Sequence, residues 1–252
     1  MVAKDVVSNA YENTDFPDQT TSYDGQSITY HKLGNPESYL GWDMIWKAGR
    51  QLATMSNGSI NISYTYDDIG IRTSKTVKGV KITYTSINGR ITSQTTDTNT
   101  VYFLYDKYEQ LVGFNLIGTE YVYTLNGQGD ITGILDSNGN RLINYSYDAW
   151  GKCTIVSDSS SNKIGSLNPL RYRGYYLDSE TGLFYVGSRY YDSGIGRWIN
   201  ADDPSVLEFG AYHILGANLF AFCGNNPIMG RDTNGYWNGW WGKKRNNGYV
   251  FG

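Results

Sequence analysis

The chain has 252 residues, among them 23 Tyr and 30 Gly but only 5 Pro, and its formal net charge is -3 at pH 7. A weakly acidic chain creates no field that would hold a polyanion, which excludes nucleic acid as a partner for the body of the protein. Aromatic residues favour pleated surfaces and glycine accepts the positive φ of tight turns, so the composition predicts an all-β fold of short strands.

The N-terminal segment, residues 1–22, is expected to be irregular. It lacks the apolar run of a secretory signal. No stretch of the chain approaches the roughly 20 apolar residues that cross a bilayer. We therefore expect no membrane span, and an export address would lie elsewhere.

A degenerate repeat occupies residues 23–165. Six segments share one degenerate form, an aromatic-x-aromatic pair whose first ring is replaced by Met44 and Ile82 in two of them, a polar turn that usually contains Gly, and then a polar–apolar alternation. The second aromatic residue of each pair marks the segment: Trp46, Tyr66, Tyr84, Tyr105, Tyr123 and Tyr147. A period of about twenty residues fits two strands and two turns, so each segment predicts a β-hairpin with both rings on one sheet face. Such hairpins are marginal alone and must stack on their neighbours.

The predicted turns carry residues that tolerate left-handed φ. They are Asp67–Gly70, Ile87–Gly89, Leu125–Gly127 and Ser137–Gly139. An Asp follows the second aromatic residue at Asp67, Asp106 and Asp148. We interpret its carboxylate as an acceptor for nearby backbone N–H groups in the turn, and not as a catalytic group.

These segments resemble the YD repeats of the RHS family, whose pattern is Tyr-x-Tyr-Asp, a glycine turn and a following strand. The resemblance covers residues 23–150 in degenerate form. It implies stacked antiparallel hairpins that form part of a spiral shell.

The segment from Asn168 to Gly235 carries more specific motifs. In order, they read NPLRYRGYYLDSETGLFYVGSRYYD, GRWINADDP, NLFAFCGNNPI and RDTNGYW. This series resembles the RHS repeat-associated core domain, which ends the hollow shells of bacterial RHS proteins, insecticidal toxin-complex C subunits and teneurins. The resemblance implies a core domain over residues 166–236 and a short variable tail over 237–252. It assigns structural roles to Arg189, Tyr191, Gly196, Arg197 and Trp198.

The stretch LFYVGSRYYD is interpreted as one strand with aromatic residues on both faces. Alternation places Phe184 and Tyr190 on one face, and Tyr185 and Tyr191 on the other. A strand with bulk on both faces is covered on both sides or faces a lined cavity.

Four arginines of the core segment are expected to brace turns through carboxylates and ring stacking. They are Arg171, Arg173, Arg189 and Arg197, among Asp178, Glu180, Asp192, Asp202 and Asp203. The alternative is that one Arg or a backbone amide tunes a nearby carboxylate.

Asn218 is expected to cap a short helix, residues 219–223, that ends at Gly224. Cys153 and Cys223 lie far apart without a CxxC pair, and His31 and His213 are isolated. We therefore expect core-packing thiols, and no disulfide, metal site or cofactor.

In the RHS family, many core domains act as an aspartyl autoprotease that cuts once after a D-P-x-G-hydrophobic motif and frees a C-terminal toxin inside the shell. The chemistry needs one ionised carboxylate to activate water and one protonated carboxylate to polarise the scissile carbonyl. The resemblance suggests Asp202, Asp203 and Asp192 as the candidates. The counterpart of the cleavage motif contains Asp232, Gly235 and Tyr236, with the cut after Tyr236.

Three departures bear on this activity and on the shell. Thr233 replaces the proline of the motif, so the scissile loop is less pre-set. Residues 237–252 are too short and glycine-rich for a folded toxin domain, and would be a truncated payload, a leftover strand or a cationic aromatic tail. Too few repeats are present to close a container. The chain is interpreted as the C-terminal part of a longer polypeptide, or as an orphan whose N-terminal edge pairs with another chain.

Three functions follow as hypotheses. The first is a structural shell segment of a polymorphic-toxin or cell-surface protein, with no turnover of added substrates. The second is the autoprotease, and the third is a module whose Tyr and Trp rings bind a glycan or a protein. The expected partners are a C-terminal payload or the rest of a longer RHS chain, an immunity protein or a cell-surface glycan. The expected location is secreted or at the cell surface, as part of a larger protein.

Overall fold

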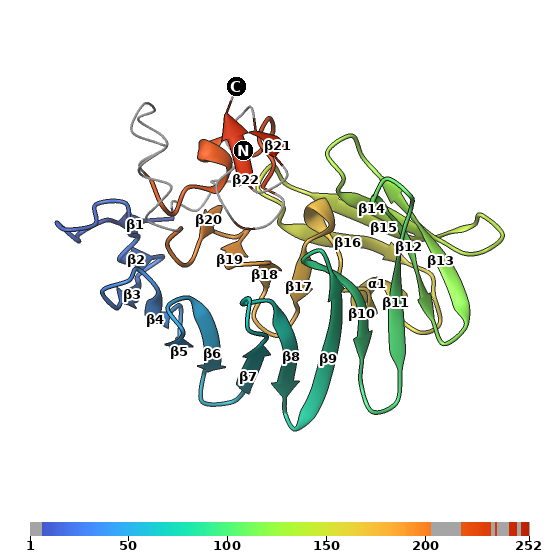
Figure 1. Cartoon of the computed structure of the whole chain (residues 1–252), viewed down its shortest axis with the longest axis horizontal. Helices are drawn as coiled ribbons and strands as arrows, with labels where there is room; N and C mark the ends of the chain where they lie inside the picture. The colour runs from blue at the N-terminus through green and yellow to red at the C-terminus, as the bar shows by residue number, and fades with distance from the viewer. Residues whose placement is uncertain (1–6, 203–217, 233–234, 236–241, 246–247, 252) are drawn as a thin grey trace.

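Sixteen strands follow one another in a single antiparallel sheet, each paired with its neighbours in sequence (Figure 1). The computed structural model describes residues 7–202, 218–232, 235, 242–245 and 248–251. The strands are β1 Asn9–Ala10, β2 Ser22–Tyr23, β3 Gln26–Tyr30, β4 Pro36–Tyr39, β5 Trp42–Lys47, β6 Gln51–Ser56, β7 Asn61–Tyr66, β8 Arg72–Val77, β9 Val80–Ile87, β10 Arg90–Thr95, β11 Thr100–Tyr105, β12 Leu111–Leu116, β13 Thr119–Leu125, β14 Ile131–Leu135, β15 Arg141–Tyr147 and β16 Cys153–Asp158. This sheet is called the wall. Its sixteen strands confirm the prediction of an all-β fold.

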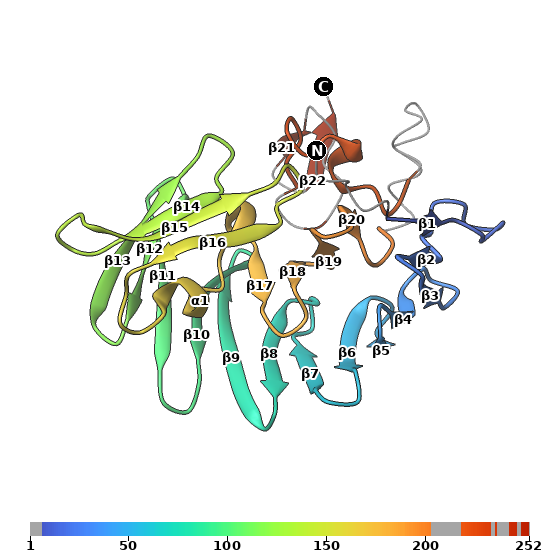
Figure 2. The ribbon, with the colours of Figure 1, turned by 180° about the vertical axis from the view of Figure 1, so that it is seen from behind.

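The segment after β16 folds back against the wall. It contains α1 Ile164–Leu167, the 3-10 turn η1 Tyr172–Gly174, and a small sheet of β17 Tyr176–Asp178, β18 Leu183–Val186, β19 Arg189–Asp192 and β20 Arg197–Trp198. Residues 168–202 are called the plug. Figures 1 and 2 show the wall curving around β17–β20. A second 3-10 turn, η3 Phe222–Asn225, and the hairpin of β21 Gly242–Arg245 and β22 Gly248–Phe251 follow.

A ladder of large apolar and aromatic side chains lines the inner face of the wall. One residue from each odd-numbered strand from β5 to β15 contributes, and each is at most 6% exposed: Met44, Tyr64, Tyr84, Phe103, Tyr123 and Tyr145. The predicted hairpins are present, but two markers were misplaced. Tyr84 and Tyr123 belong to this ladder, whereas each of the other four markers lies two residues after the ladder residue of its own strand.

Tyrosines at the strand ends connect successive hairpins. The Tyr66 hydroxyl donates to the backbone carbonyl of Leu52 at 3.0 Å. The Tyr105 and Tyr147 hydroxyls make the same kind of bond to the preceding hairpin, at 3.1 and 2.7 Å. Each ring therefore packs inward while its polar end satisfies a buried backbone acceptor.

A β-bulge recurs at the same place in successive hairpins. Within residues 42–135, the pairing skips one residue early in the second strand of each of five hairpins: Ala53, Thr73, Thr92, Val112 and Thr132. A bulge bends its strand and increases the local twist, so its repetition gives the wall its curvature.

The aspartates after the paired aromatics act as predicted. The Asp67 carboxylate accepts from the backbone N–H groups of Ile69 and Ile71, at 3.1 and 2.8 Å. Asp106 and Asp148 each accept two backbone N–H groups in the same way. These carboxylates close turns, which supports the structural interpretation.

Most of the predicted left-handed turn positions are confirmed. Gly70 and Gly139 have φ of +85° and +83°, and Asn88 has φ of +54°. The prediction for Leu125–Gly127 is wrong, because the left-handed residue of that turn is Gly129, with φ of +86°. The Asn126 side chain accepts from the N–H groups of Gln128 and Asp130, which moves the turn two residues along the chain.

Two further local predictions are corrected. LFYVGSRYYD is a hairpin and not one strand, because the chain reverses at Gly187, whose φ is +60°. The helix expected over residues 219–223 is replaced by the 3-10 turn η3, in which Cys223 and Gly224 have positive φ. Asn218 does not cap this turn, because the N-cap of η3 is Ala221 and no side chain caps it. The Asn218 side chain accepts from the Phe220 N–H at 3.0 Å, in the turn that precedes η3.

Residues 7–22 are irregular apart from two short pairings. β1 pairs with β2, which pairs with β3. The described part of the chain contains no helix with the length and apolar character needed to span a membrane.

Candidate functional site

Both faces of the β18–β19 hairpin are buried, as expected for a strand region with aromatics on each side. Tyr185 and Tyr190 join the inner-face ladder of the wall. On the opposite face, Phe184 and Tyr191 pack in a second aromatic cluster. There Tyr191 stacks on Phe222 with ring centroids 4.0 Å apart. The plug is thus held between the wall and the segment that follows it.

Four charged residues, the Arg72 cluster, connect the wall to the plug: Arg72, Lys75, Asp178 and Glu180. The Asp178 carboxylate accepts from Arg72 at 2.6 and 3.2 Å and from the Lys75 ammonium at 2.9 Å. The Lys75 ammonium also lies 2.8 Å from the Glu180 carboxylate. The Arg72 and Asp178 side chains are fully buried, whereas Glu180 remains 22% exposed.

An aromatic cage surrounds the Arg72 guanidinium. Four tyrosine rings have centroids between 4.2 and 5.4 Å from it: Tyr64, Tyr84, Tyr176 and Tyr185. Burial disfavours the charged guanidinium, but the Asp178 carboxylate together with the nearby Tyr84 and Tyr190 hydroxyls outweighs this and holds the pKa of Arg72 well above its usual value. Burial likewise opposes ionisation of Asp178, but Arg72 and Lys75 hold the pKa of Asp178 below its usual value. Arg72 and Asp178 are therefore charged at neutral pH.

A second group, the Arg189 cluster, gathers two of the candidate carboxylates. Arg189 Nη2 lies 2.8 Å from the Asp202 carboxylate and 3.1 Å from the Asp232 carboxylate. All three side chains are at least 95% buried. The guanidinium also lies 4.0 Å from the Trp198 ring centroid. Burial lowers the pKa of Arg189, and the two carboxylates offset part of that effect.

Arg50 adds a contact from the wall to the same cluster. Its guanidinium donates to the backbone carbonyl of Asp202 at 2.8 Å. The Asp202 N–H donates to the Leu219 carbonyl at 3.0 Å. Asp202 is therefore fixed through its side chain and both of its backbone polar groups.

The remaining predicted site residues lie apart or outside the described residues. Asp192 accepts from the Tyr39 hydroxyl at 2.8 Å and from the Gly194 N–H at 2.7 Å, in a turn away from the Arg189 cluster. Asp203 and Tyr236 fall outside the described residues. The structure thus brings together Asp202 and Asp232 but not Asp192.

The residues assigned structural roles all make packing or turn contacts. The Tyr191 hydroxyl donates to the Trp150 carbonyl at 2.6 Å, and a Cβ added to Gly196 would lie 2.7 Å from the Trp150 ring. The Arg197 guanidinium lies 5.5 Å from the Tyr11 ring centroid.

Two of the predicted bracing arginines bind backbone carbonyls and not carboxylates. Arg171 donates to the carbonyls of Leu170 and Gly165. Arg173 donates to the carbonyls of Pro227 and Gly230, which ties the plug to the chain after η3. The expectation of turn bracing holds for both, through a different acceptor.

Neither described thiol is prepared for nucleophilic or metal chemistry. Cys153 and Cys223 are unpaired, and burial raises the pKa of Cys223 to about 12. Among the described residues, no three His, Cys, Asp or Glu side chains gather in a way that could hold a metal ion.

A cavity of about 1110 Å³ separates the hairpin tips of the wall from the plug. The wall contributes turns and strand ends, among them Arg50, Tyr66 and Arg90, and the plug contributes Tyr175 and Ser188. The cavity therefore extends to the turn of the β18–β19 hairpin, beside the Arg189 cluster.

Comparison with known proteins assigns this architecture to a family. The sequence model of the teneurin YD-shell family matches residues 47–228, which cover the hairpins from β6 onward and the plug. The chain belongs to the teneurin YD-shell family.

Curated relatives of this chain include a bacterial nuclease and a bacterial toxin subunit. The tRNA3(Ser)-specific nuclease WapA of Bacillus spizizenii is 33% identical over 226 residues, covering 87% of this chain and 9% of the relative. The toxin subunit YenC1 of Yersinia entomophaga is 34% identical over 101 residues, covering 40% of this chain and 9% of the relative. The chain thus spans about a tenth of the length of these relatives.

A solved structure shares the fold. The crystal structure of TcdB2-TccC3 superposes with a TM-score of 0.59 at 22% identity, covering 78% of this chain and 10% of that one. The likeness shows that the two chains share this fold over the matched part.

Proposed function

We propose that this chain closes one end of a shell that encloses or presents a C-terminal payload or the rest of a longer RHS chain. The observation that carries the proposal is the Arg72 cluster, in which the plug inserts Asp178 between two cations of the wall. Removing one partner from a buried ion pair is strongly unfavourable, so the plug is a permanent part of the wall and not a removable lid.

The relatives support a toxin-type context. One is named as a nuclease and another as a toxin subunit. We propose that the whole protein is secreted or displayed at the cell surface, with an immunity protein or a cell-surface glycan as further partners. We propose no turnover of external substrates by the residues described here.

The closing role predicts that plug and wall stay together without a covalent link. A protease site inserted in the loop at Ser159–Ser161 allows the chain to be cut between them. We expect the two pieces to co-elute in size-exclusion chromatography at neutral pH, and to separate when Asp178→Ala is introduced. Separation of the pieces in the otherwise unchanged chain would contradict a permanent plug.

We propose single-turnover self-cleavage as a second function, which the Arg189 cluster favours. One guanidinium there holds Asp202, from the GRWINADDP motif, beside Asp232, from the cleavage motif. In the reaction, a water oxygen bonds to the carbonyl carbon of Tyr236. The bond from that carbon to the nitrogen of Trp237 then breaks, and this nitrogen takes up a proton. Asp202 or Asp203 would accept the proton of the water.

Intact-mass spectrometry tests this reaction on chain that is purified in denaturant and then refolded. We expect a fragment that ends at Tyr236. Asp202→Asn should slow its formation by about 100-fold or more, the usual contribution of a general base. Asp203→Asn, made separately, shows which neighbouring carboxylate acts. Asp192→Asn serves as the control, with an unchanged rate. A wild-type chain that stays uncut after prolonged incubation would refute self-cleavage.

A further inference from the structure

A second cavity, of about 390 Å³, lies between the wall and the segment that leads into the plug. It is called the amide pocket. Ten residues line it: Gln94, Thr96, Asn99, Val101, Phe114, Leu116, Ile117, Asn162, Leu167 and Asn168. None of these residues is charged, whereas four arginines and two carboxylates line the larger cavity beside the plug. The amide pocket therefore suits an uncharged ligand, because a charged group buried there would meet no opposite charge.

The strand register places the floor of the amide pocket on three neighbouring strands. Gln94 of β10 pairs with Val101 of β11, and Val101 pairs with Leu116 of β12. Residues paired in this way point to the same face of the sheet. Phe114, which belongs to the buried core on the inner face of the wall, lies beside them and is only 2% exposed. The floor is thus apolar, with one amide at its edge.

The opposite side of the amide pocket is held in place by hydrogen bonds. The Gly165 N–H donates to the Asp158 carboxylate at 3.0 Å, and the Gly165 carbonyl accepts from the Tyr145 hydroxyl at 2.8 Å. The Asn168 side chain accepts from the Tyr123 hydroxyl at 2.6 Å. These bonds fix α1 and the residue after it to the wall. A pocket that is formed in advance binds its ligand at a lower entropic cost.

The Gln94 amide offers a hydrogen-bond donor to the pocket. Its Oε1 atom accepts from the Tyr176 hydroxyl at 2.7 Å, and that hydroxyl accepts in turn from Tyr84 at 3.3 Å. Burial holds the pKa of Tyr176 well above its usual value, so this hydroxyl keeps its proton. Since Oε1 is engaged, Nε2 of the same amide supplies the donor capacity. The matching group on a ligand is a carbonyl or hydroxyl oxygen.

The rim of the amide pocket carries an isoleucine in a strained conformation. Ile117 and Gly118 form the two-residue turn between β12 and β13, with φ of +50° and +80°. A β-branched residue rarely adopts positive φ, and such a turn favours Asn before Gly. The Ile117 side chain is also 70% exposed, and that of Leu167 in α1 is 56% exposed. Strain of this kind persists mainly at functional positions.

We propose that the amide pocket binds a small uncharged molecule with an apolar body and one oxygen acceptor, of the amide, ester or alcohol class. The apolar body lies on Val101, Phe114 and Leu116, and the oxygen accepts from Gln94 Nε2. A sugar fits less well, because the one aromatic ring of the pocket, Phe114, is buried and stacked on Tyr121 with ring centroids 4.9 Å apart. This binding is independent of the closing role and of self-cleavage.

Methyl NMR spectra of the chain, labelled at its Ile, Leu and Val methyl groups, test the proposal with hexanamide as the probe. We expect hexanamide to shift the signals of Val101, Leu116 and Leu167 in a saturable manner. Butanamide, which is two methylenes shorter, should bind about tenfold more weakly. Hexanoate should be weaker than hexanamide by about tenfold or more, because its charge meets no cation in the pocket. Glucose, which lacks an apolar body, should cause no shifts.

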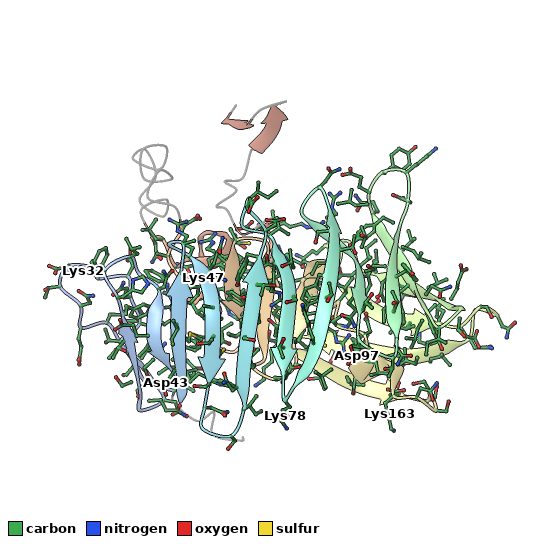
Figure 3. All side chains as sticks on the ribbon, turned by 60° about the horizontal axis from the view of Figure 1, so that its bottom comes forward. Lys32, Asp43, Lys47, Lys78, Asp97 and Lys163 are labelled. Carbon is green, nitrogen blue, oxygen red and sulfur yellow. The ribbon has the colours of Figure 1, made fainter. Side chains whose placement is uncertain are left out.

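Ile117→Asn separates the binding role from stability. The substitution relieves the strain of the turn and removes an apolar side chain from the rim. We expect the thermal midpoint to rise while hexanamide binds about 3- to 10-fold more weakly. Lys78→Asn is the matched control, because Lys78 and Gly79 form an equivalent turn, with φ of +50° and +82°, at a hairpin tip outside the pocket (Figure 3). It should raise the midpoint and leave the affinity unchanged.

Gln94→Glu tests the hydrogen bond to the ligand. The glutamate keeps an oxygen for the Tyr176 hydroxyl and replaces the Nε2 donor by a second oxygen. We expect hexanamide to bind about 5- to 10-fold more weakly to this variant, the effect of one hydrogen bond.

Four results would each overturn the proposal. The first is the absence of saturable shifts at Val101 and Leu116 with hexanamide. The second is equal affinity for hexanamide and hexanoate, and the third is an unchanged hexanamide affinity in both Ile117→Asn and Gln94→Glu. The fourth is a loss of affinity in Lys78→Asn as large as that in Ile117→Asn, which would assign the effect to the change of turn and not to the rim of the pocket.

Discussion

Asp178→Asn is expected to lower the free energy of unfolding by about 3–5 kcal/mol at pH 7, the usual cost of removing one partner of a buried ion pair. The substitution leaves the Arg72 guanidinium fully buried without its carboxylate. It also removes one of the two carboxylates that contact Lys75. Urea unfolding followed by tryptophan fluorescence measures the effect.

Asp97→Asn is the matched control for this prediction. Asp97 is exposed in the turn between β10 and β11 (Figure 3). The same chemical change there should alter the unfolding free energy by less than about 0.5 kcal/mol. If Asp178→Asn costs no more than Asp97→Asn, the Arg72 cluster does not hold the plug on the wall.

The pH dependence of the unfolding free energy, compared between the wild type and Asp178→Asn, gives a second check. The pKa of Asp178 lies below its usual value in the folded state, so its contribution is complete above the unfolded pKa of about 3.9. The contribution is lost as pH falls through the lower folded pKa. The stability difference between wild type and Asp178→Asn should therefore shrink on acidification below about pH 4. A difference that stays constant there would contradict the charged cluster.

The repeat architecture could be predicted because its signals are local. The aromatic pairs, the glycine turns and the Asp67 type of turn acceptor all act within one hairpin, so a single period reveals them. The misplaced markers Tyr84 and Tyr123 show the limit of that approach. Strands β9 and β13 continue two or three residues beyond these aromatics, whereas β7, β11 and β15 end at theirs, and only the cross-strand pairing fixes the register.

The Arg72 cluster was missed because it depends on pairing over long range. Arg72 contacts a residue 106 positions later, which no periodicity connects. A signal did exist in the repeat itself. Arg72 pairs with Tyr66, near the end of the first strand of its hairpin. The residues at the same position of three other hairpins are apolar: Leu52, Leu111 and Ile131. A charged residue at an apolar repeat position indicates a buried partner from elsewhere in the chain.

The Arg189 cluster was predicted only in part. The resemblance identified Asp202 and Asp232, but assigned Arg189 a general structural role. Their meeting at one guanidinium depends on the reversal of the chain at Gly187, and the single-strand interpretation of LFYVGSRYYD hid that reversal. Asp192 was included because it matches the Tyr-Tyr-Asp that precedes the motif in the family, whereas its carboxylate accepts from the Tyr39 hydroxyl and the Gly194 N–H.

Gly196→Ala is expected to lower the free energy of unfolding by about 2–4 kcal/mol, the sum of left-handed strain and overpacking. Gly196 has φ of +76°, and an added Cβ would lie 2.7 Å from the Trp150 ring. Gly139→Ala provides the control, since Gly139 has φ of +83° with nothing within 4 Å of the added Cβ. Gly139→Ala should lower the free energy of unfolding by the backbone strain alone, about 1–2 kcal/mol.

The difference between these two variants measures the contact between plug and wall at one point. Trp150 belongs to the last turn of the wall, between β15 and β16, and its carbonyl also accepts from the Tyr191 hydroxyl of the plug. If Gly196→Ala and Gly139→Ala cost the same in urea unfolding, Trp150 moves aside freely and the plug is not closely packed there. A larger cost for Gly196→Ala means that the glycine is required by the approach of the plug to the wall, and not only by its turn.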